Sequence, residues 1–341
     1  MLRTKGITLL AATLLTAGLL AGCGEAKENA ATEAAQATNG ANANSPVGNA
    51  DADQPANSGN AATGPVKIIH AWGETELGAT PQKVVTLDFS FIDTLVALGV
   101  TPAGNAGVGE TKIPEYLQDQ ISGEVADVGE RKAPNLEVIE SVGPDLILAS
   151  QDRQNMIKTE LQAIAPTIAL DDNSYQEILD NVDTIAKALG KEAEAEQVRK
   201  NLEDRIGEAK RQIGNQPSVL VIGAFDDEFT VWLKGSFIGS LLTDIGANYA
   251  FEGEKAELEG KAEGAKMTLE RLSEINPDFI FMYGDDVDKY KDNPLFGSLK
   301  AVQDNHMISV DRNLWSRGRG PTAANKILDE AIPLLTGQSS K

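Results

Sequence analysis

The sequence contains very little cysteine, histidine and aromatic side chain. Its 341 residues include one cysteine, Cys23, and two histidines, His70 and His306, and 5% of them are aromatic. A single cysteine excludes an internal disulfide and a thiolate metal cluster, and two histidines exclude a site built from three imidazoles. Signatures of a nucleophile elbow, a phosphate loop, a dinucleotide site or a zinc site are also missing. We therefore expect no resident metal and no enzymatic activity.

Basic residues are scarce as well. Lysine and arginine total 30 against 51 aspartates and glutamates, so the formal net charge is -21 at pH 7. Nucleic acid is excluded as a partner because phosphate binding needs a basic surface. The hydrophobic content of 41% is enough for an ordinary buried core, and the length predicts about two domains.

The first 22 residues are predicted to be a secretory signal peptide. Arg3 and Lys5 precede a mostly apolar run at residues 7–21. At about 1.5 Å of rise per residue, this run is too short to cross about 30 Å of hydrocarbon. The sequence Leu-Ala-Gly-Cys at residues 20–23 resembles a bacterial lipobox, whose cysteine carries a diacylglycerol. A cysteine placed there by chance is the alternative, but Cys23 is the only cysteine in the chain. We expect a lipid anchor on the extracytoplasmic face of the cell membrane.

Residues 23–65 have the composition of a tether. Residues 24–65 contain no aromatic side chain, no leucine and no isoleucine. Such a segment cannot bury enough apolar surface to offset the entropy of ordering its backbone. The sequence therefore predicts a disordered tether between the anchor and a globular body that begins near residue 66.

The body contains an internal repeat. Residues 136–148 and 269–281 match at a constant offset, and each stretch predicts a short helix, a Pro-Asp turn and a buried strand. A weaker match pairs residues 91–95 with 237–241, each downstream of a predicted strand. Strands that alternate with helices indicate parallel α/β sheets. The fold class expected from this pattern is α/β, with two Rossmann-like lobes at residues 66–190 and 215–341.

The longest predicted helix lies between the two copies, at residues 191–214. Apolar residues recur along it at spacings of three and four, which places them on one face: Ala195, Val198, Leu202, Ile206 and Ala209. A surface helix within one domain is the alternative. Its position between the repeats favours a single helix that joins the two lobes.

Five arginines lie in predicted loops after strands or before a helix: Arg131, Arg153, Arg312, Arg317 and Arg319. Ligands of open α/β sheets bind beyond the carboxyl ends of the strands. Guanidinium groups remain charged and match carboxylate oxygens with a rigid fork. Pro321, at the start of a predicted helix, adds free backbone N–H groups beside them. The pattern predicts an anion site. Separate surface arginines with local carboxylate partners are the alternative.

Aromatic side chains are expected in the same cleft. Trp232 follows a strand of the second lobe, Tyr283 ends another, and Trp315 lies among the arginines. Packing at a hinge or on an exposed hairpin is the alternative role for Trp232 and Tyr283.

The whole body, together with the lipobox, resembles bacterial substrate-binding lipoproteins of ABC importers for ferric siderophores. The resemblance is carried by residues 80–85, 93–100, 128–137 and 319–324. It implies the class III periplasmic-binding-protein fold, with two rigid lobes joined by one helix. The five arginines resemble those of receptors for citrate-based ligands. They are Arg131 and Arg153 in the first lobe and Arg312, Arg317 and Arg319 in the second.

The resemblance also implies partners. The cargo would be an anionic ferric siderophore, either a citrate-based carboxylate or a mixed citrate-hydroxamate, and the protein would need no cofactor of its own. A monomeric protein would dock on an ABC permease dimer through Glu137 and Glu270, which occupy equivalent positions of the repeat. Charge compensation at a helix N-terminus is the alternative role for these glutamates.

Two other hypotheses remain open, namely haem or a corrinoid as the cargo and a surface enzyme such as a calcium-dependent hydrolase. If the cargo is an anionic ferric siderophore, alanine at Arg317 or Arg319 is expected to weaken its binding by about 1.5–3 kcal/mol. The melting temperature should hardly change.

Overall fold

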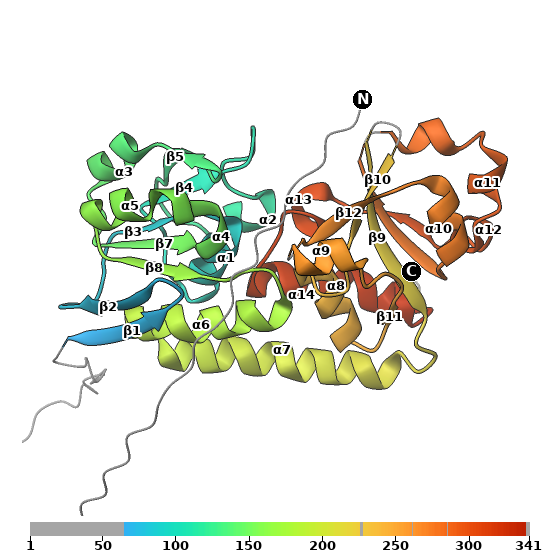
Figure 1. Cartoon of the computed structure of the whole chain (residues 1–341). Helices are drawn as coiled ribbons and strands as arrows, with labels where there is room; N and C mark the ends of the chain where they lie inside the picture. The colour runs from blue at the N-terminus through green and yellow to red at the C-terminus, as the bar shows by residue number, and fades with distance from the viewer. Residues whose placement is uncertain (1–64, 226–227, 261, 285, 339–341) are drawn as a thin grey trace, which may run out of the picture. The chain divides into compact units, whose positions relative to one another are not determined.

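A computed structural model of the chain describes residues 65–225, 228–260, 262–284 and 286–338. The predicted signal peptide, Cys23 and all but the last residue of the predicted tether lie outside the described residues. The described part of the chain forms two α/β lobes (Figure 1) within one compact unit, Gly59–Lys341.

The first lobe is built on a six-stranded sheet with the strand order β6-β5-β4-β3-β7-β8. β6 pairs antiparallel with β5, and the other neighbours run parallel. The strands, together with the separate β1–β2 hairpin, are β1 (Val66–His70), β2 (Gly73–Leu77), β3 (Val84–Thr86), β4 (Gly104–Gly107), β5 (Ala126–Glu130), β6 (Ala133–Pro134), β7 (Leu146–Ser150) and β8 (Thr167–Leu170). The helices are α1 (Phe89–Ala97), α2 (Glu115–Gln118), α3 (Leu136–Val142), α4 (Gln151–Gln154), η1 (Asn155–Ile157), α5 (Lys158–Ile164) and α6 (Tyr175–Leu189).

The second lobe has a sheet with the order β12-β10-β9-β13-β14, and β11 also pairs with β9. Its strands are β9 (Ser218–Phe225), β10 (Glu228–Trp232), β11 (Asn248–Tyr249), β12 (Gly264–Met267), β13 (Phe279–Tyr283) and β14 (Met307–Ser309). Its helices are α8 (Phe237–Asp244), α9 (Lys255–Glu259), α10 (Leu269–Ile275), η2 (Val287–Tyr290), α11 (Pro294–Gly297), α12 (Lys300–Gln303), α13 (Arg312–Trp315) and α14 (Pro321–Leu335).

The repeat read from the sequence is confirmed in the fold. α3 and α10 end on a residue in the left-handed region, Gly143 at φ 63° and Asn276 at φ 44°, where each chain turns toward its strand. β7 and β13 are buried at every position, as expected for parallel strands covered on both faces. Before each strand an aspartate accepts backbone N–H groups at the start of the neighbouring strand, Asp145 from Lys83 and Asp278 from Ser218.

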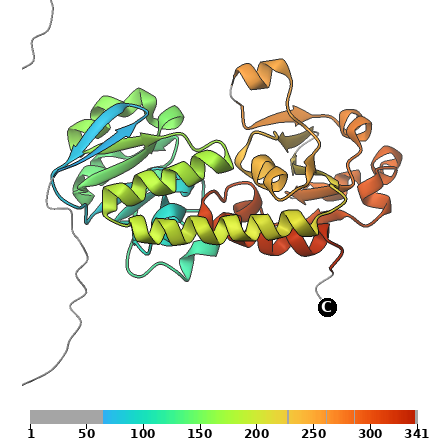
Figure 2. The ribbon, with the colours of Figure 1, turned by 90° about the horizontal axis from the view of Figure 1, so that it is seen from below.

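The long helix is also confirmed. α7 (Glu192–Gln212) has acidic residues in its first turn and basic residues in its last, which complements the helix dipole. Its buried face divides between two hydrophobic cores. Ala195 belongs to the first-lobe core, whereas Leu202 and Ala209 belong to the second-lobe core. Figure 2 shows α7 running along both lobes, so this helix joins them as the pattern predicts.

Candidate functional site

The five predicted arginines lie at strand ends or just before α14. Arg131 directly follows β5, and Arg153 lies on α4, which begins immediately after β7. Arg312 is the first residue of α13, and Arg317 and Arg319 lie between α13 and α14. The prediction that all five lie in loops is wrong for Arg153 and Arg312, which sit on short helices. Both lobes nevertheless present arginines beyond the carboxyl ends of parallel strands, where ligands of such folds bind.

Arg153 and Arg319, here called the inner pair, have side chains that are only 14% and 3% exposed. Arg153 Nη1 lies 2.9 Å from Asp172 Oδ1, and Arg153 Nε lies 3.4 Å from Asp88 Oδ2. Arg319 Nη1 donates to the backbone carbonyl of Asp172 at 3.0 Å and pairs with the Glu263 carboxylate. Each inner arginine is therefore balanced by carboxylates.

The pKa shifts follow from this balance. Burial lowers the pKa of Arg319, but the charges of Glu263 and Asp172 outweigh burial and leave it raised. Arg153 behaves in the same way, because Asp88 and Asp172 overcome its desolvation. Burial alone would raise the pKa of Asp88, and the neighbouring arginines reverse that and lower it. The inner guanidinium groups thus stay charged inside a compensated network.

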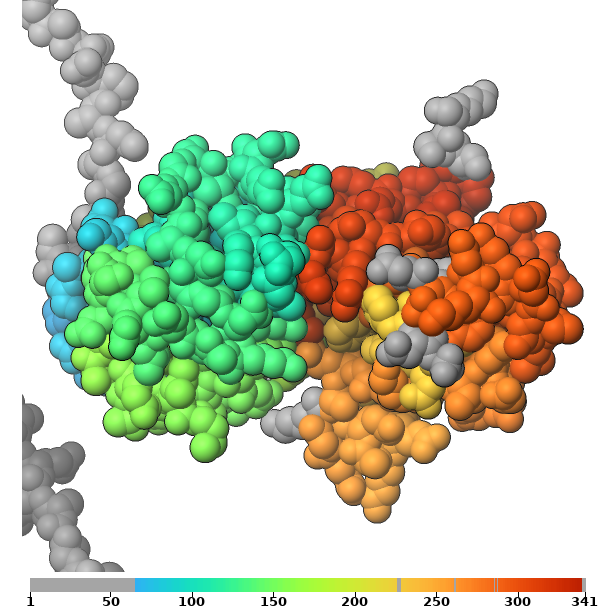
Figure 3. Space-filling view, turned by 90° about the horizontal axis from the view of Figure 1, so that it is seen from above, coloured from blue at the N-terminus to red at the C-terminus, as the bar shows by residue number. Residues whose placement is uncertain are grey.

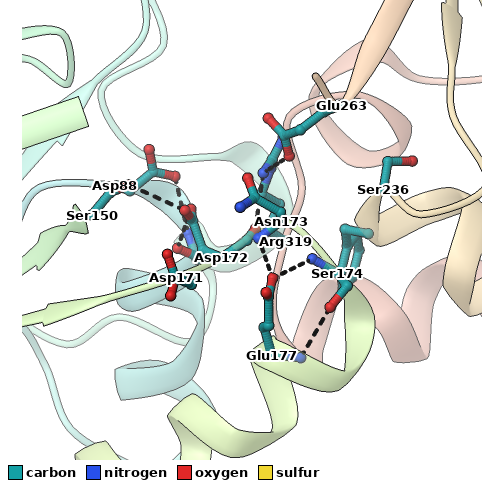
Figure 4. A network of polar contacts seen from close by, with 12 residues as sticks. Asp88, Ser150, Asp171, Asp172, Asn173, Ser174, Glu177, Ser236, Glu263 and Arg319 are labelled. Atoms are coloured by element: carbon teal, nitrogen blue, oxygen red, sulfur yellow. Dashed lines mark hydrogen bonds and ion pairs between the residues drawn. The ribbon is translucent and has the colours of Figure 1, made fainter. Parts of the chain in front are cut away.

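One carboxylate connects the two lobes through the inner pair. Glu263 belongs to the second lobe and pairs with Arg319 of that lobe, while its Oε2 lies 3.5 Å from Nη2 of Arg153 in the first lobe. Arg319 in turn reaches back to Asp172 of the first lobe, as Figure 4 shows from close by. The inner pair is therefore part of a charge network that spans both lobes.

The other three arginines, Arg131, Arg312 and Arg317, are here called the outer trio. Arg317 Nη1 donates to Asn313 Oδ1 at 2.9 Å and to Thr111 Oγ1 of the first lobe at 3.1 Å. Within the described residues, no ion pair joins Arg312 or Arg317 to a carboxylate. Figure 3 shows, in space-filling form, the teal first-lobe surface against the orange-red second-lobe surface on the face seen from above.

Like charges act on one another within the outer trio. Burial lowers the pKa of Arg317, and the positive charges of Arg312 and Arg131 lower it further. Arg131 has a single carboxylate near it, with Nη1 3.4 Å from Asp88 Oδ2, and its buried Nε has no hydrogen-bond partner among the described residues. Unlike the inner pair, the outer trio is an excess of positive charge that an anion would stabilise.

Of the three predicted aromatic residues, Tyr283 lies beside Arg312 and Arg317 of the outer trio. Trp232 lies beside Arg319 of the inner pair, whose guanidinium carbon is 5.8 Å from its ring centroid. Trp232 Nε1 donates to the Tyr283 hydroxyl at 3.0 Å. Burial raises the pKa of Tyr283, and the nearby charges of Arg312 and Arg317 oppose that rise, which places these arginines close to the phenol. Trp315 is different. Its side chain is 1% exposed and stacks on Phe281 at 4.5 Å between ring centroids, so it belongs to the core of the second lobe.

The expected free N–H groups at the start of α14 are not free. Asp93 of α1 accepts the N–H of Thr322 at 2.7 Å and of Ala323 at 2.9 Å, so the carboxyl group of this residue already occupies the helix terminus. Gly320 has φ +127°, and a Cβ there would lie 2.4 Å from the Asp93 carboxyl carbon, so the close approach requires glycine. Burial raises the pKa of Asp93 to about 7 against the opposing effect of these N–H groups.

Sequence reasoning missed the acids of the site. Only under the alternative of separate surface arginines did it name local partners, which were Asp127, Glu130, Asp152 and Asp311. The ion-pair partners among the described residues are instead Asp88, Asp172 and Glu263. Asp88 and Asp172 follow β3 and β8, so they carry the same strand-end signal that selected the arginines. No such signal marks Glu263, which precedes an edge strand of the other lobe.

Glu137 and Glu270 occupy equivalent exposed positions in the first turns of α3 and α10. The side chains of Asn135 and Thr268 cap the two helices by accepting a backbone N–H. Among the described residues, neither glutamate takes part in an ion pair. Both carboxylates thus point to solvent from matched places on the two lobes.

The described histidines lie in structural surroundings. His70 Nε2 lies 2.9 Å from Thr75 Oγ1 in the β1–β2 hairpin, and His306 stacks on Phe279 at 4.0 Å between ring centroids. No group of three His, Cys, Asp or Glu side chains suited to a metal ion occurs in the part of the chain that the structure describes. The helices in that part also include none with the length and apolar character of a membrane span.

Comparison with known proteins agrees with this architecture. The model of the periplasmic binding protein family matches residues 84–314. The putative ABC transporter substrate-binding lipoprotein YhfQ of Bacillus subtilis (strain 168) is 39% identical over 281 residues, covering 78% of this chain and 87% of that protein. The Fe(3+)-citrate-binding protein YfmC of the same strain is 35% identical over 263 residues, covering 74% and 81%.

A more distant relative and a solved structure extend the comparison. The Fe(3+) dicitrate-binding periplasmic protein FecB of Escherichia coli (strain K12) is 30% identical over 277 residues, covering 78% of this chain and 89% of that protein. The crystal structure of Staphylococcus aureus SirA complexed with staphyloferrin B superposes with a TM-score of 0.69 at 27% identity, covering 79% of this chain and 98% of that one. On the matched family model and these relatives, the chain belongs to the periplasmic binding protein family.

Proposed function

We propose that this protein binds an anionic ferric siderophore outside the membrane and delivers it to an ABC permease for iron uptake. The observation that carries the proposal is the outer trio. Arg312 and Arg131 act on Arg317 across the two lobes, and among the described residues only Arg131 pairs with a carboxylate, so the positive charge is incompletely balanced. A chelate with free carboxylate oxygens supplies that balance through charge-assisted hydrogen bonds. The chelator itself provides the iron ligands.

The class of chelate follows from the donors available. Guanidinium groups match carboxylates bidentately, which favours a citrate-based or mixed citrate-hydroxamate ligand. The names of YfmC and FecB, which mention ferric citrate, support the same choice. We assign Trp232 and Tyr283 to the wall of the ligand site, since Tyr283 lies beside the outer trio, and Trp232 contacts Tyr283 and lies beside Arg319.

The test is a titration monitored by tryptophan fluorescence with ferric citrate, a ferric citrate-hydroxamate and a ferric catecholate. Quenching is expected for the two carboxylate chelates, and the indole of Trp232 is the expected reporter. Absence of quenching by any chelate below about 10 μM, where the binding free energy is about 7 kcal/mol, rejects the proposal. Arg271→Ala is the matched control, because Arg271 is exposed and pairs only with Glu274 of its own helix.

Haem or a corrinoid is the alternative cargo. Neither described histidine lies in the arginine site, and no observation of the structure favours this cargo. Haem added to the protein is expected to give no new Soret band. A saturable Soret band would show that the ligand is haem and not a siderophore.

For delivery we assign permease docking to Glu137 and Glu270. Each is exposed in the first turn of a helix, and the two lie at equivalent positions of the repeat. The double variant Glu137→Ala with Glu270→Ala is expected to bind the chelate normally and to lose iron uptake in cells. Glu140→Ala, on the exposed face of the same helix α3, is the control and is expected to retain uptake. Normal uptake by the double variant rejects the assignment.

We also propose a lipid anchor on Cys23, with the protein held as a monomer on the extracytoplasmic face of the membrane. Cys23→Ser is expected to move the protein from the membrane fraction to the soluble fraction.

The bound chelate should be recovered intact by mass spectrometry, since the proposed role involves no chemical turnover. A degraded chelate would instead indicate enzymatic activity.

A further inference from the structure

Glu263 occupies an unusual position among the acids of the site. It lies between α9 and β12 of the second lobe, and its carboxylate contacts one arginine from each lobe, Arg319 and Arg153. A single carboxylate held by two guanidinium groups of different lobes is the arrangement that a bound ligand carboxylate would adopt in this cleft.

The other two acids of the inner network are fixed in place. Asp172 is 2% exposed, and its carboxylate also accepts the hydroxyls of Ser90 at 3.0 Å and Ser150 at 3.2 Å. Asp88 is fully buried and caps α1 by accepting the backbone N–H of Ser90. Removing either acid would leave buried hydrogen-bond donors without their acceptor, so both acids are fixed parts of the site.

Glu263 is held much less firmly. Its side chain is 20% exposed, and its contacts among the described residues are the two arginines of the inner pair. When it leaves, Asp88 and Asp172 still hold Arg153 in position, and the carbonyl of Asp172 still holds Arg319. The network can therefore lose this carboxylate without losing its geometry.

We propose that Glu263 is a displaceable internal carboxylate, which fills the inner pair in the empty protein and gives way to a carboxylate of the incoming chelate. This inference rests on the proposed function. Exchanging one carboxylate for another keeps the charge of the buried site constant, whereas a ligand that displaced Glu263 without supplying a carboxylate would leave the buried guanidinium group of Arg319 without its ion pair. Glu263 thereby selects for carboxylate ligands, and its return to the inner pair assists their release.

The test compares Glu263→Gln with Glu259→Gln. Glu259 lies on α9 in the same segment, and its one ion pair with the described residues is with exposed Lys255, so its variant makes the same change of charge outside the site. With ferric citrate, Glu263→Gln is expected to bind about tenfold tighter than the natural protein, which is about 1.4 kcal/mol. Glu259→Gln should bind as the natural protein does. Unchanged or weaker binding by Glu263→Gln overturns the inference.

A second variant protects the test against misfolding. Glu263→Asp keeps the charge, but its shorter side chain cannot reach both arginines at once, so folded Glu263→Asp is expected to bind ferric citrate more tightly by a smaller factor, about threefold. Natural affinity in this folded variant contradicts the inference.

A probe without iron separates this inference from the proposed function. If no ferric chelate binds any variant, the proposed function fails. Iron-free citrate then tests the inference alone, through the rise in melting temperature that it causes. A larger rise for Glu263→Gln than for the natural protein supports a displaceable carboxylate, and an equal rise or none in both overturns it.

Discussion

The inner pair and the outer trio consist of the same residue type at the same ends of the sheets, yet their charges are balanced differently. Arg153 and Arg319 are surrounded by three carboxylates and a backbone carbonyl. Among the residues that the structure describes, the outer trio has one ion pair with a carboxylate, between Arg131 and Asp88 at 3.4 Å. Position alone therefore does not decide what an arginine does.

The sequence predicted one role, ligand binding, for all five arginines. The difference in charge balance indicates two roles. Buried ion pairs lose their partners at a high cost, because a buried charge without compensation remains. Exposed or half-buried cations without partners cost little to remove but gain much from an anion. We infer that the inner pair maintains the interface of the lobes as well as receiving one carboxylate of the ligand, and that the outer trio supplies the main affinity for ligand.

The sharpest test of this contrast is Arg319→Ala. The variant leaves the carbonyl of Asp172 without the donor Arg319, and leaves Glu263 with only the 3.5 Å contact to Arg153, in a site where Arg319 is 3% exposed. The free energy of unfolding in urea is expected to fall by about 3–5 kcal/mol. The expectation that replacing Arg319 leaves stability nearly unchanged is thus revised. Arg271→Ala should cost less than about 0.5 kcal/mol, and an equally small loss for Arg319→Ala would remove the distinction.

Asp93 provides a third case, a buried carboxyl group that forms no ion pair with the described residues. Burial raises the pKa of Asp93 from its ordinary value of 3.8 to about 7, so the folded protein holds a proton on this group up to about pH 7. Between these values the unfolded chain has fewer protons bound, so raising the pH favours unfolding and the stability contributed by this group is lost as pH passes 7. The effect reaches at most about 4 kcal/mol, since one pKa unit is about 1.4 kcal/mol.

Urea denaturation of the natural protein and of Asp93→Asn at pH 4 to 8 measures this effect. The natural protein should lose stability relative to the variant as the pH rises. Parallel curves would instead show that the N–H groups of Thr322 and Ala323 hold the carboxylate ionised throughout.

Arg317→Ala should lower the affinity for the chelate and preserve the free energy of unfolding, which Arg319→Ala lowers. Arg317 has hydrogen bonds to Thr111 and Asn313 but no carboxylate to leave behind. Ferric citrate binding is expected to weaken by about 1.5–3 kcal/mol, the range for hydrogen bonds to charged groups, with little change in the free energy of unfolding. Titration and urea denaturation of the same preparation distinguish a loss of affinity from a loss of stability. Lost stability with natural affinity would make Arg317 structural.

The smallest expected effect concerns how Arg312 is held. Its guanidinium carbon lies 4.4 Å from the ring centroid of Phe225. Phe225→Leu removes this cation–π contact, worth about 0.5–1 kcal/mol at an exposed site, and should weaken chelate binding by no more than that. Measurement by the same fluorescence titration suffices. A loss as large as that of Arg317→Ala would mean that Phe225 contacts the ligand directly.

Much of the fold could be predicted because its signals are local. The apolar spacing on α7, the Pro-Asp turns before β7 and β13, and proline at the start of α14 each act within a few residues. The repeat adds the two-lobed arrangement. The positions of the five arginines followed from the same local reading, apart from the short helices that contain Arg153 and Arg312.

The sequence by itself determined which elements form, that they form twice, and that arginines follow the strands. Only the tertiary structure decided which arginines are neutralised, because their partners come from distant parts of the chain. Glu263 lies 110 residues from Arg153, and Asp172 lies 147 residues from Arg319. The same holds for the capped start of α14, where Asp93 is 229 residues from Thr322. Coulomb energy depends on separation in space and on burial, and neither quantity can be read along the chain.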